Sequence, residues 1–312
     1  MNVDHARRKV IFLDTLEKCD ILLIRRCSPF SFETVQTVLK DTTFIQRNDL
    51  GEQLAKTIQR QSSNFQLLAR SMLRWVIRKQ KKNTHSSTAS LLIFGGAPGS
   101  GKSHMATERT TERTTDAVTY DSDADKLRIL YLLKMTPTML ETEEALVEFL
   151  EPSGIKIEWL GDYLQPLQRI IRESIFKGLA ELCYDVTVIG LHANIESLQK
   201  TADAFRDYKD CSFHFVDIFE QPEEQERRLS EREKEASHFA ILPIAYARKA
   251  AVSMHEMVRR PELGKLAASR NAEVLLTTIG SFREPLGRCR AETTVLVKKN
   301  TLPPLRPRSY TM

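Results

Sequence analysis

The chain has 312 residues, enough for one large domain or for a main domain with an appendage, and 41% of the residues are hydrophobic. The sequence has no apolar run of roughly 18 residues that would predict a membrane span, and residues 1–9 are polar with no signal-peptide-like stretch behind them. The five cysteines show no C-x-x-C spacing, so we expect reduced thiols in a cytoplasmic protein rather than disulfides or a zinc site.

The net charge of +5 is unevenly distributed along the chain. Residues 1–90 carry 16 Lys and Arg against 8 Asp and Glu, residues 283–312 carry 7 against 2, and the segment between them is acidic. Basic ends are typical of contact with nucleic acid, with an anionic membrane, or with the acidic body itself. Because aromatic side chains for base stacking are not interleaved with the basic ones, we favour docking or plain solvation and do not expect a nucleic-acid partner.

Residues 1–90 are predicted to be helical, because apolar residues recur there at spacings of three and four. These positions are Leu50, Leu54, Ile58, Phe65, Leu68, Met72, Trp75 and Val76. The periodicity ends in the polar stretch 79–88, which we take as the boundary of this region. We interpret the region as a packing or solubilising appendage; a regulatory or partner-binding role is the alternative.

A short apolar strand at 91–94 leads directly into a glycine-rich loop that satisfies G-x-x-x-x-G-K-[ST]. Glycines let the backbone turn its N–H groups inward as an anion nest, Lys102 reaches the β- and γ-phosphates, and the Ser103 hydroxyl binds Mg²⁺. The pattern is more specific than a glycine-rich turn that only ends a strand, so it predicts a nucleoside triphosphate site. The expected binding residues are Gly96, Ala97, Pro98, Gly99, Ser100, Gly101, Lys102, Ser103 and His104.

From residue 91 onward, short β-rich runs alternate with helical stretches, which predicts an α/β domain with a parallel sheet flanked by helices over 91–282. The expected strands are 91–94, 117–120, 186–189, 213–216 and 274–279. The expected helices are 102–115, 164–182, 196–208, 222–235 and 244–259. Residues 283–312 form a basic, Pro-containing tail, expected to be disordered near its end or to act as a docking peptide.

An acidic stretch over 119–128 follows the second expected strand. The carboxyl ends of parallel strands form the ligand crevice, so a carboxylate here is placed to accept a proton from an acceptor hydroxyl or to help hold Mg²⁺. We assign Asp123 as the candidate catalytic base and Asp121 as a candidate metal ligand. Helix capping by the same carboxylates is the alternative.

The loop and the stretch Tyr-Asp-Ser-Asp-Ala-Asp-Lys-Leu-Arg resemble the zeta-toxin family of P-loop kinases. Members phosphorylate a sugar hydroxyl of UDP-activated amino sugars with ATP. The resemblance implies a kinase-like P-loop fold that uses ATP and Mg²⁺, with Lys102, Ser103 and Asp123 in the phosphate-binding, metal-binding and base roles. It also implies that Arg228 or Arg232 stabilises the transferring phosphoryl group, although the glutamates around them equally fit a salt-bridged surface helix.

The chain departs from that family at two places. Where the family has Glu-Gly-Thr after the third strand, this chain has Ile-Gly-Leu-His at 189–192. The family's second arginine ahead of Pro243 is also absent, and Arg248 in the next helix is a candidate substitute. The resemblance therefore supports ATP chemistry more strongly than it supports an amino-sugar nucleotide as the acceptor.

A P-loop ATPase is the competing class, because residues 213–217 are a run of bulky residues ending in an acid. In that class Asp217 would hold Mg²⁺ through a water and Glu220 would orient an attacking water. A nucleotide-binding regulatory module without turnover is a third class. We favour a Mg²⁺- and ATP-dependent phosphotransferase acting on a hydroxyl of a small metabolite. A toxin or translocated effector, with an antitoxin or regulatory protein as partner, is what the resemblance implies.

Overall fold

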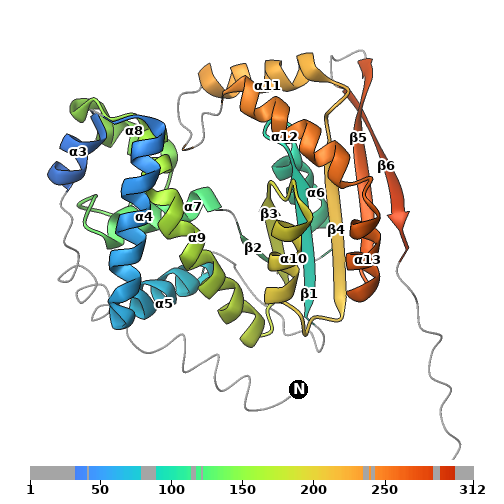
Figure 1. Ribbon diagram of the computed structural model, residues 1–312, viewed down its shortest axis with the longest axis horizontal. Coiled ribbons are helices and arrows are strands. Elements are labelled where there is room, and N and C mark those ends of the chain that lie inside the picture. The colour runs from blue at the N-terminus through green and yellow to red at the C-terminus, as the bar shows by residue number, and fades with distance from the viewer. Residues whose placement is uncertain are drawn as a thin grey trace, which may run out of the picture.

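A six-stranded sheet with the order β2-β3-β1-β4-β5-β6 forms the centre of the fold, and all neighbours are parallel except β5 and β6 (Figure 1). The computed structural model describes residues 32–40, 42–78, 89–113, 117–120, 122–234, 239, 243–283 and 289–298. The strands are β1 Ser90–Gly96, β2 Val118–Tyr120, β3 Val186–Gly190, β4 Asp210–Asp217, β5 Glu273–Arg283 and β6 Cys289–Val297.

Helices lie on both faces of the sheet, which is the expected arrangement for parallel strands joined by crossovers. Figure 1 shows α10 in front of the sheet, α6 behind it, and α11 across the carboxyl ends of the strands. The helices are α3 Phe32–Lys40, α4 Phe44–Arg60, α5 Ser62–Arg78, α6 Lys102–Arg113, α7 Ser122–Leu132, α8 Glu143–Leu150, α9 Ile157–Glu181, α10 Ile195–Ala204, α11 Pro222–Lys234, α12 Ile244–Met257 and α13 Pro261–Ser269.

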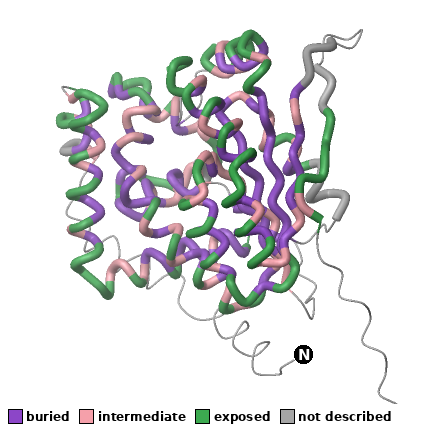
Figure 2. The backbone as a smooth tube through the Cα atoms, turned by 45° about the vertical axis from the view of Figure 1, so that its right-hand side comes forward, coloured by how far each residue is buried: buried purple, intermediate pink, exposed green. Residues whose placement is uncertain are grey.

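The central strands are buried on both faces, whereas β6 is an exposed edge strand. Every described residue of β4 after Asp210 is buried, and most of β1 is buried as well. Figure 2 shows this contrast between the buried middle of the sheet and its exposed edge. Strands that are buried on both faces, such as β1 and β4, belong in the middle of a parallel sheet. The loop that follows β1 therefore also lies near the middle of the sheet.

The helices of the N-terminal region pack onto the rest of the fold through α9. Leu54 of α4 and Leu73 of α5 belong to the same hydrophobic core as Ile93 of β1. Arg47 of α4 binds the Asp162 carboxylate of α9, with its Nε 3.1 Å and its Nη2 3.0 Å from the same Oδ2. The described helices of this region are therefore part of the same hydrophobic core as the sheet.

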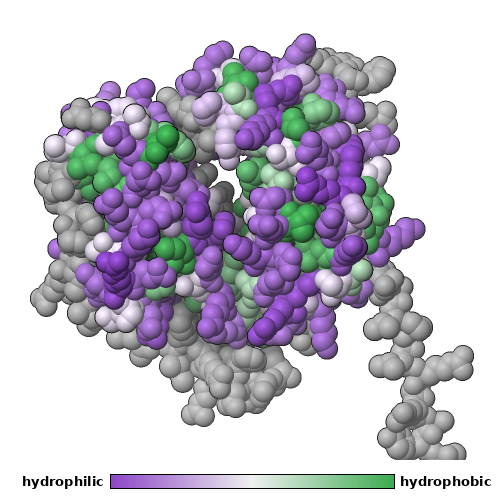
Figure 3. Space-filling view, in the orientation of Figure 1, coloured by the Kyte–Doolittle hydropathy of each residue, from purple (hydrophilic) through white to green (hydrophobic). Residues whose placement is uncertain are grey.

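The surface of this helical part carries hydrophobic residues, seen in Figure 3 over the helices at the left of the view. Some of the hydrophobic residues of this part line an apolar groove: Val35, Val38, Leu39, Leu50, Leu54 and Tyr163. The groove lies on α3, α4 and α9, away from the loop that follows β1, so we do not assign it a part in phosphate chemistry.

The five expected strands and five expected helices are all present, with shifted ends. The structure adds α7, α8, α13 and β6, which the sequence pattern did not predict. The strand β6 corrects the predicted boundary at residue 282, because it pairs with β5 inside the segment assigned to the tail. The predicted helix before residue 32, the polar stretch 79–88 and the end of the tail after 298 lie outside the described residues.

Three further expectations concern what the chain lacks. Within the described ranges no helix is long and apolar enough to cross a membrane, and no group of three His, Cys, Asp or Glu side chains is arranged to hold a metal ion. Cys183 and Cys211 are free thiols, the first exposed and the second buried.

Candidate functional site

The glycine-rich loop connects the carboxyl end of β1 to α6 in the middle of the sheet. Gly99 and Gly101 have φ angles of +79° and +86°, which L-residues with a side chain rarely adopt. Ser100 N donates to Ala97 O at 3.1 Å, closing a tight turn within the loop. The helix α6 begins at Lys102, so its positive N-terminal end faces the loop. The chain thus builds the anion-binding geometry that the motif predicts.

Both strands next to β1 meet this loop. Gly96 pairs with Val216 of β4, and its N–H donates to Leu191 O, just after β3, at 3.2 Å. A Cβ on Gly96 would lie 2.5 Å from Ser100 Oγ, so only glycine fits there without a shift. Ser100 Oγ is buried and has no hydrogen-bond partner among the described residues. The loop therefore contains a polar atom that the protein itself leaves unsatisfied.

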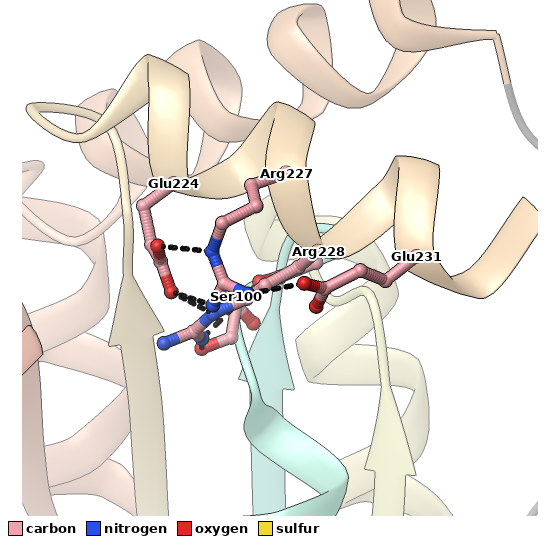
Figure 4. Close-up of polar contacts among 6 residues, drawn as sticks. Ser100, Glu224, Arg227, Arg228 and Glu231 are labelled. Atoms are coloured by element: carbon pink, nitrogen blue, oxygen red, sulfur yellow. Dashed lines mark hydrogen bonds and ion pairs between the residues drawn. The ribbon is translucent and has the colours of Figure 1, made fainter. Parts of the chain in front are cut away.

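The helix α11 contacts the outer side of the loop. Gln225 Nε2 donates to Pro98 O at 2.8 Å, and Arg228 Nη1 donates to Gly99 O at 3.3 Å and to Ser100 O at 3.1 Å. Figure 4 shows the side chains beneath α11 that reach the loop at Ser100. Gln225 was not predicted as a site residue, because nothing in the sequence connects it to a loop 127 positions earlier.

Glu224 links the two arginines of this helix. Arg227 donates from Nε to Oε2 (2.9 Å) and from Nη2 to Oε1 (2.8 Å), and Arg228 donates from Nε to Oε1 (2.7 Å). Hydrogen bonds from Arg227, and secondarily from Arg228, lower the pKa of the Glu224 carboxyl to about 2, against the effect of its burial. Arg227 also pairs with Glu231, and these carboxylates raise the pKa of Arg227 further (Figure 4). The salt-bridged interpretation is thus right for Arg227 and Arg228.

Two other arginines lie close to this arrangement. Arg232 is half-buried one helical turn beyond Arg228, and within the described part of the chain it forms no hydrogen bond or ion pair. Arg248 Nη1 of α12 donates to Gln225 Oε1 at 3.1 Å. Arg248 therefore contacts the residue that binds the loop, and its role as a substitute for the missing second arginine stays a prediction.

The candidate Walker-B acid, Asp217, lies at the end of β4 with its side chain almost fully buried. Its Oδ1 accepts from Phe219 N at 3.0 Å. Its Oδ2 is 2.9 Å from His255 Nδ1 and 3.4 Å from Arg259 Nη1, both from the region of α12. Both oxygens are engaged in contacts that fasten α12 to β4, which argues for a structural role rather than a metal-binding one.

On the other side of β1, the acidic stretch begins α7 after β2. Asp123 lies in the first turn of α7 but its side chain is outside the described part, as is the whole of Asp121. Asp125 is buried beside Tyr120, and this carboxylate adds to the effect of burial in raising the pKa of the Tyr120 hydroxyl. Gln168 Nε2 of α9 donates to Tyr120 Oη at 2.7 Å. Asp125 was not assigned from the sequence, although it continues the same Asp-x-Asp-x-Asp spacing.

His192 follows β3 at the edge of the same crevice. It has a φ of +43°, is only 5% exposed, and neither ring nitrogen has a hydrogen-bond partner in the described structure. Burial, followed by the positive charges of Arg172 and Lys102, lowers the pKa of the imidazole to about 3, so the ring is neutral near neutral pH. Gly190 provides its space, because a Cβ there would lie 2.8 Å from His192 Nε2.

A strand, a complete G-x-x-x-x-G-K-S loop and a helix at the centre of a mostly parallel sheet define a P-loop NTPase fold of the kinase-like type. In the sequence of this loop the chain resembles the zeta-toxin family. No protein-family model matches the chain. No curated protein matches it either.

Several solved structures are similar to the chain, including the following two. One is from the PezAT chromosomal toxin–antitoxin system of the human pathogen Streptococcus pneumoniae, with 16% identity over 74% of this chain and 80% of that chain, and a TM-score of 0.47. The other is from the Pnkp1/Rnl/Hen1 RNA repair complex, with 23% identity over 57% of this chain and 47% of that chain, and a TM-score of 0.38. At these identities the similarity concerns the fold, and the function is argued from the site itself.

Proposed function

We propose that this chain is a Mg²⁺- and ATP-dependent phosphotransferase that acts on a hydroxyl group of a small metabolite. The observation that carries the proposal is the complete phosphate-binding loop between the central strand and α6, with Gly99 and Gly101 in the left-handed conformation. Such a loop presents N–H groups and the end of a helix dipole to a triphosphate. Lys102 supplies the cation that neutralises charge on the β- and γ-phosphates.

The residues at the start of α6 fit a Mg²⁺–nucleotide complex. Ser103 is exposed in the first turn of α6, so its hydroxyl can reach a metal held against the phosphates. The unsatisfied Ser100 Oγ gives a further polar atom inside the loop. A bound Mg²⁺ would draw negative charge away from the phosphoryl group that is transferred.

Arg232 is the better candidate of the two arginines for the phosphoryl group. Arg228 already donates to the loop carbonyls and to Glu224, whereas Arg232 has no partner among the described residues. A planar guanidinium suits charge that is spread over phosphoryl oxygens. We therefore assign Arg232, rather than Arg228, to the γ-phosphate.

Transfer to an acceptor is favoured over hydrolysis because the acid that a hydrolytic mechanism would use is engaged elsewhere. Both carboxylate oxygens of Asp217 accept hydrogen bonds or pair with cations of the protein. The acidic first turns of α7, in contrast, follow β2 at the carboxyl edge of the sheet, where an acceptor would enter. Asp123 remains the proposed base that orients or deprotonates the acceptor hydroxyl. A growth-inhibiting role with an antitoxin partner is a prediction from the resemblance.

The test is a mass-spectrometric comparison of a small-metabolite extract incubated with MgATP and the protein. We expect one species to gain a phosphoryl mass, and to lose that gain with Lys102→Ala and with Asp123→Ala. Lys177→Ala is the matched control, because Lys177 is an exposed lysine on α9, far along the chain from the loop.

Two outcomes would contradict the proposal. Release of phosphate from ATP without any new phosphorylated species would identify a hydrolase instead. Loss of transfer in Asp217→Asn together with full transfer in Asp123→Ala would move the chemistry to the β4 side of the loop.

A further inference from the structure

The phosphate-binding loop is fastened from outside by three hydrogen bonds from α11. Gln225 Nε2 binds Pro98 O, and Arg228 Nη1 binds Gly99 O and Ser100 O. We propose that Gln225 and Arg228 are positioning residues that fix three successive peptide groups of the loop and so aim the N–H groups of Gly99 and Gly101 at the phosphates. The N–H of the middle peptide group, that of Ser100, closes the turn onto Ala97 O. The inference deepens the proposed function and rests on it.

The physical basis is the rigidity of the peptide unit. In a planar trans peptide the C=O and the N–H point in opposite directions, so a donor that holds the carbonyl also sets the direction of the amide. Glycine-rich segments have many backbone conformations of similar energy, and external hydrogen bonds select one of them. A nest whose N–H groups already converge needs no reorganisation when the anion arrives.

The side chain of Gln225 is itself fixed by hydrogen bonds to its neighbours. Its side chain is completely buried, and Nε2 has a second acceptor in Ala247 O of α12 at 3.0 Å. Its Oε1 accepts from Arg248 Nη1. The amide therefore makes three hydrogen bonds to the loop and to α12, and it cannot turn without breaking all of them.

Arg228 is held by the acidic side chain one turn earlier in α11. Glu224 is buried and accepts from Arg228 Nε at 2.7 Å, while Arg227 binds the same carboxylate with two further hydrogen bonds. Hydrogen bonds between ionised groups are stronger and shorter than neutral ones. The guanidinium of Arg228 thus has a fixed orientation, with Nη1 turned to the loop.

The loop and the helix also lie close together at two glycines of the loop. A Cβ on Gly99 would lie 3.2 Å from Gln225 Cγ and 3.3 Å from Leu229 Cγ, and a Cβ on Gly101 would lie 2.9 Å from Arg228 Nη1. These glycines therefore serve two needs at once, the positive φ and the close contact with α11. The loop and α11 form one packed unit.

The decisive experiment compares Arg228→Met with Arg227→Met in the full-length protein, using MgADP as the probe in calorimetric titrations. The two substitutions are identical, neighbouring, and both break contacts to Glu224, but only Arg228 touches the loop. We expect MgADP to bind Arg228→Met about tenfold more weakly than it binds Arg227→Met, because two hydrogen bonds from a charged donor are lost. The thermal midpoints of the two variants are expected to match.

Two further measurements separate positioning from a general loss of structure. Arg228→Lys, which keeps a cationic donor, is expected to recover part of the affinity. The amide resonances of Gly99 and Gly101 are expected to shift in Arg228→Met and in Gln225→Glu, but not in Arg227→Met, before any nucleotide is added.

Each result decides between the claims. If Arg228→Met and Gln225→Glu bind MgADP within about twofold of the wild type, the positioning role is overturned and the proposed function stands. If the wild-type protein binds neither MgADP nor MgATP, both are overturned. Weaker binding with unmoved glycine resonances would also contradict positioning and would indicate direct contact with the nucleotide.

Discussion

The two sides of the central strand satisfy their buried polar groups differently. On the β4 side, both carboxylate oxygens of Asp217 and of Glu224, and both polar atoms of the Gln225 amide, have protein partners. On the β3 side, the two ring nitrogens of His192 and Gln168 Oε1 are buried without a hydrogen bond in the described part of the chain.

This difference is expected to set how much the polar groups of each side contribute to stability. A buried polar atom without a partner costs about 1–3 kcal/mol. We expect the largest loss of stability from a substitution on the β4 side that removes a shared acceptor. Substitutions on the β3 side are expected to cost less stability, and one of these losses is expected to depend on pH. Three predictions test this division.

The largest effect is expected for Asp217→Ala. The substitution leaves the His255 imidazole and Phe219 N–H without their acceptor, and we expect the free energy of unfolding to fall by about 3 kcal/mol. Arg259 adds little because half of its side chain is exposed. Denaturant unfolding measures the change, and Glu220→Ala, at an exposed position nearby, is expected to stay within about 0.5 kcal/mol of the wild type. If Asp217→Ala unfolds at the same denaturant concentration as the wild type, Asp217 has no structural role on the β4 side.

An intermediate effect, dependent on pH, is expected for His192. The folded-state pKa of about 3 lies below the ordinary value of 6.5, so below pH 6.5 the unfolded chain binds a proton that the native state does not. Stability is therefore lost as the pH falls, and this residue accounts for about 2 kcal/mol between about pH 7.5 and pH 5.

The variants His192→Leu and His192→Asn cannot take up this proton. Both are expected to lose that part of the pH dependence when unfolding is measured at the two pH values. If either variant retains the full dependence of the wild type, His192 is not the buried neutral group described above.

The smallest effect is expected for Tyr120→Phe, which removes the acceptor of Gln168 Nε2. The Gln168 amide then loses a hydrogen bond on the β3 side, and we expect the free energy of unfolding to fall by about 1 kcal/mol. Tyr246→Phe, at an exposed position of α12, is the matched control and is expected to change stability by less than about 0.5 kcal/mol. Equal values for the two variants would show that the Tyr120 hydroxyl contributes nothing to the fold.

The sequence predicted the parts of the fold that depend on patterns of neighbouring residues. The strands on both sides of the loop are apolar runs, and the loop itself is defined by glycines, Lys102 and Ser103 at fixed spacing. It did not predict β6, because its described side chains are mostly exposed, so that only its pairing with β5 makes it a strand. It did not predict α7, because three aspartates next to a strand are typical of a loop.

The site divides in the same way. The residues of the loop could be found from spacing alone, while the roles of Gln225 and Arg228 depend on hydrogen bonds to residues 127 to 129 positions away. The choice between Arg228 and Arg232 was open in the sequence, because both lie among glutamates on one helix. Only the partners of each side chain distinguish them.

The fastening of the loop by α11 has a consequence for the order in which the protein matures. The glycine-rich segment is synthesised more than 120 residues before the helix whose side chains hold its carbonyls. Until α11 has packed against the loop and α12, a nascent or partly folded chain carries the motif without the backbone conformation proposed to bind a phosphate. Under the proposed function, nucleotide binding is then one of the last properties that the polypeptide acquires.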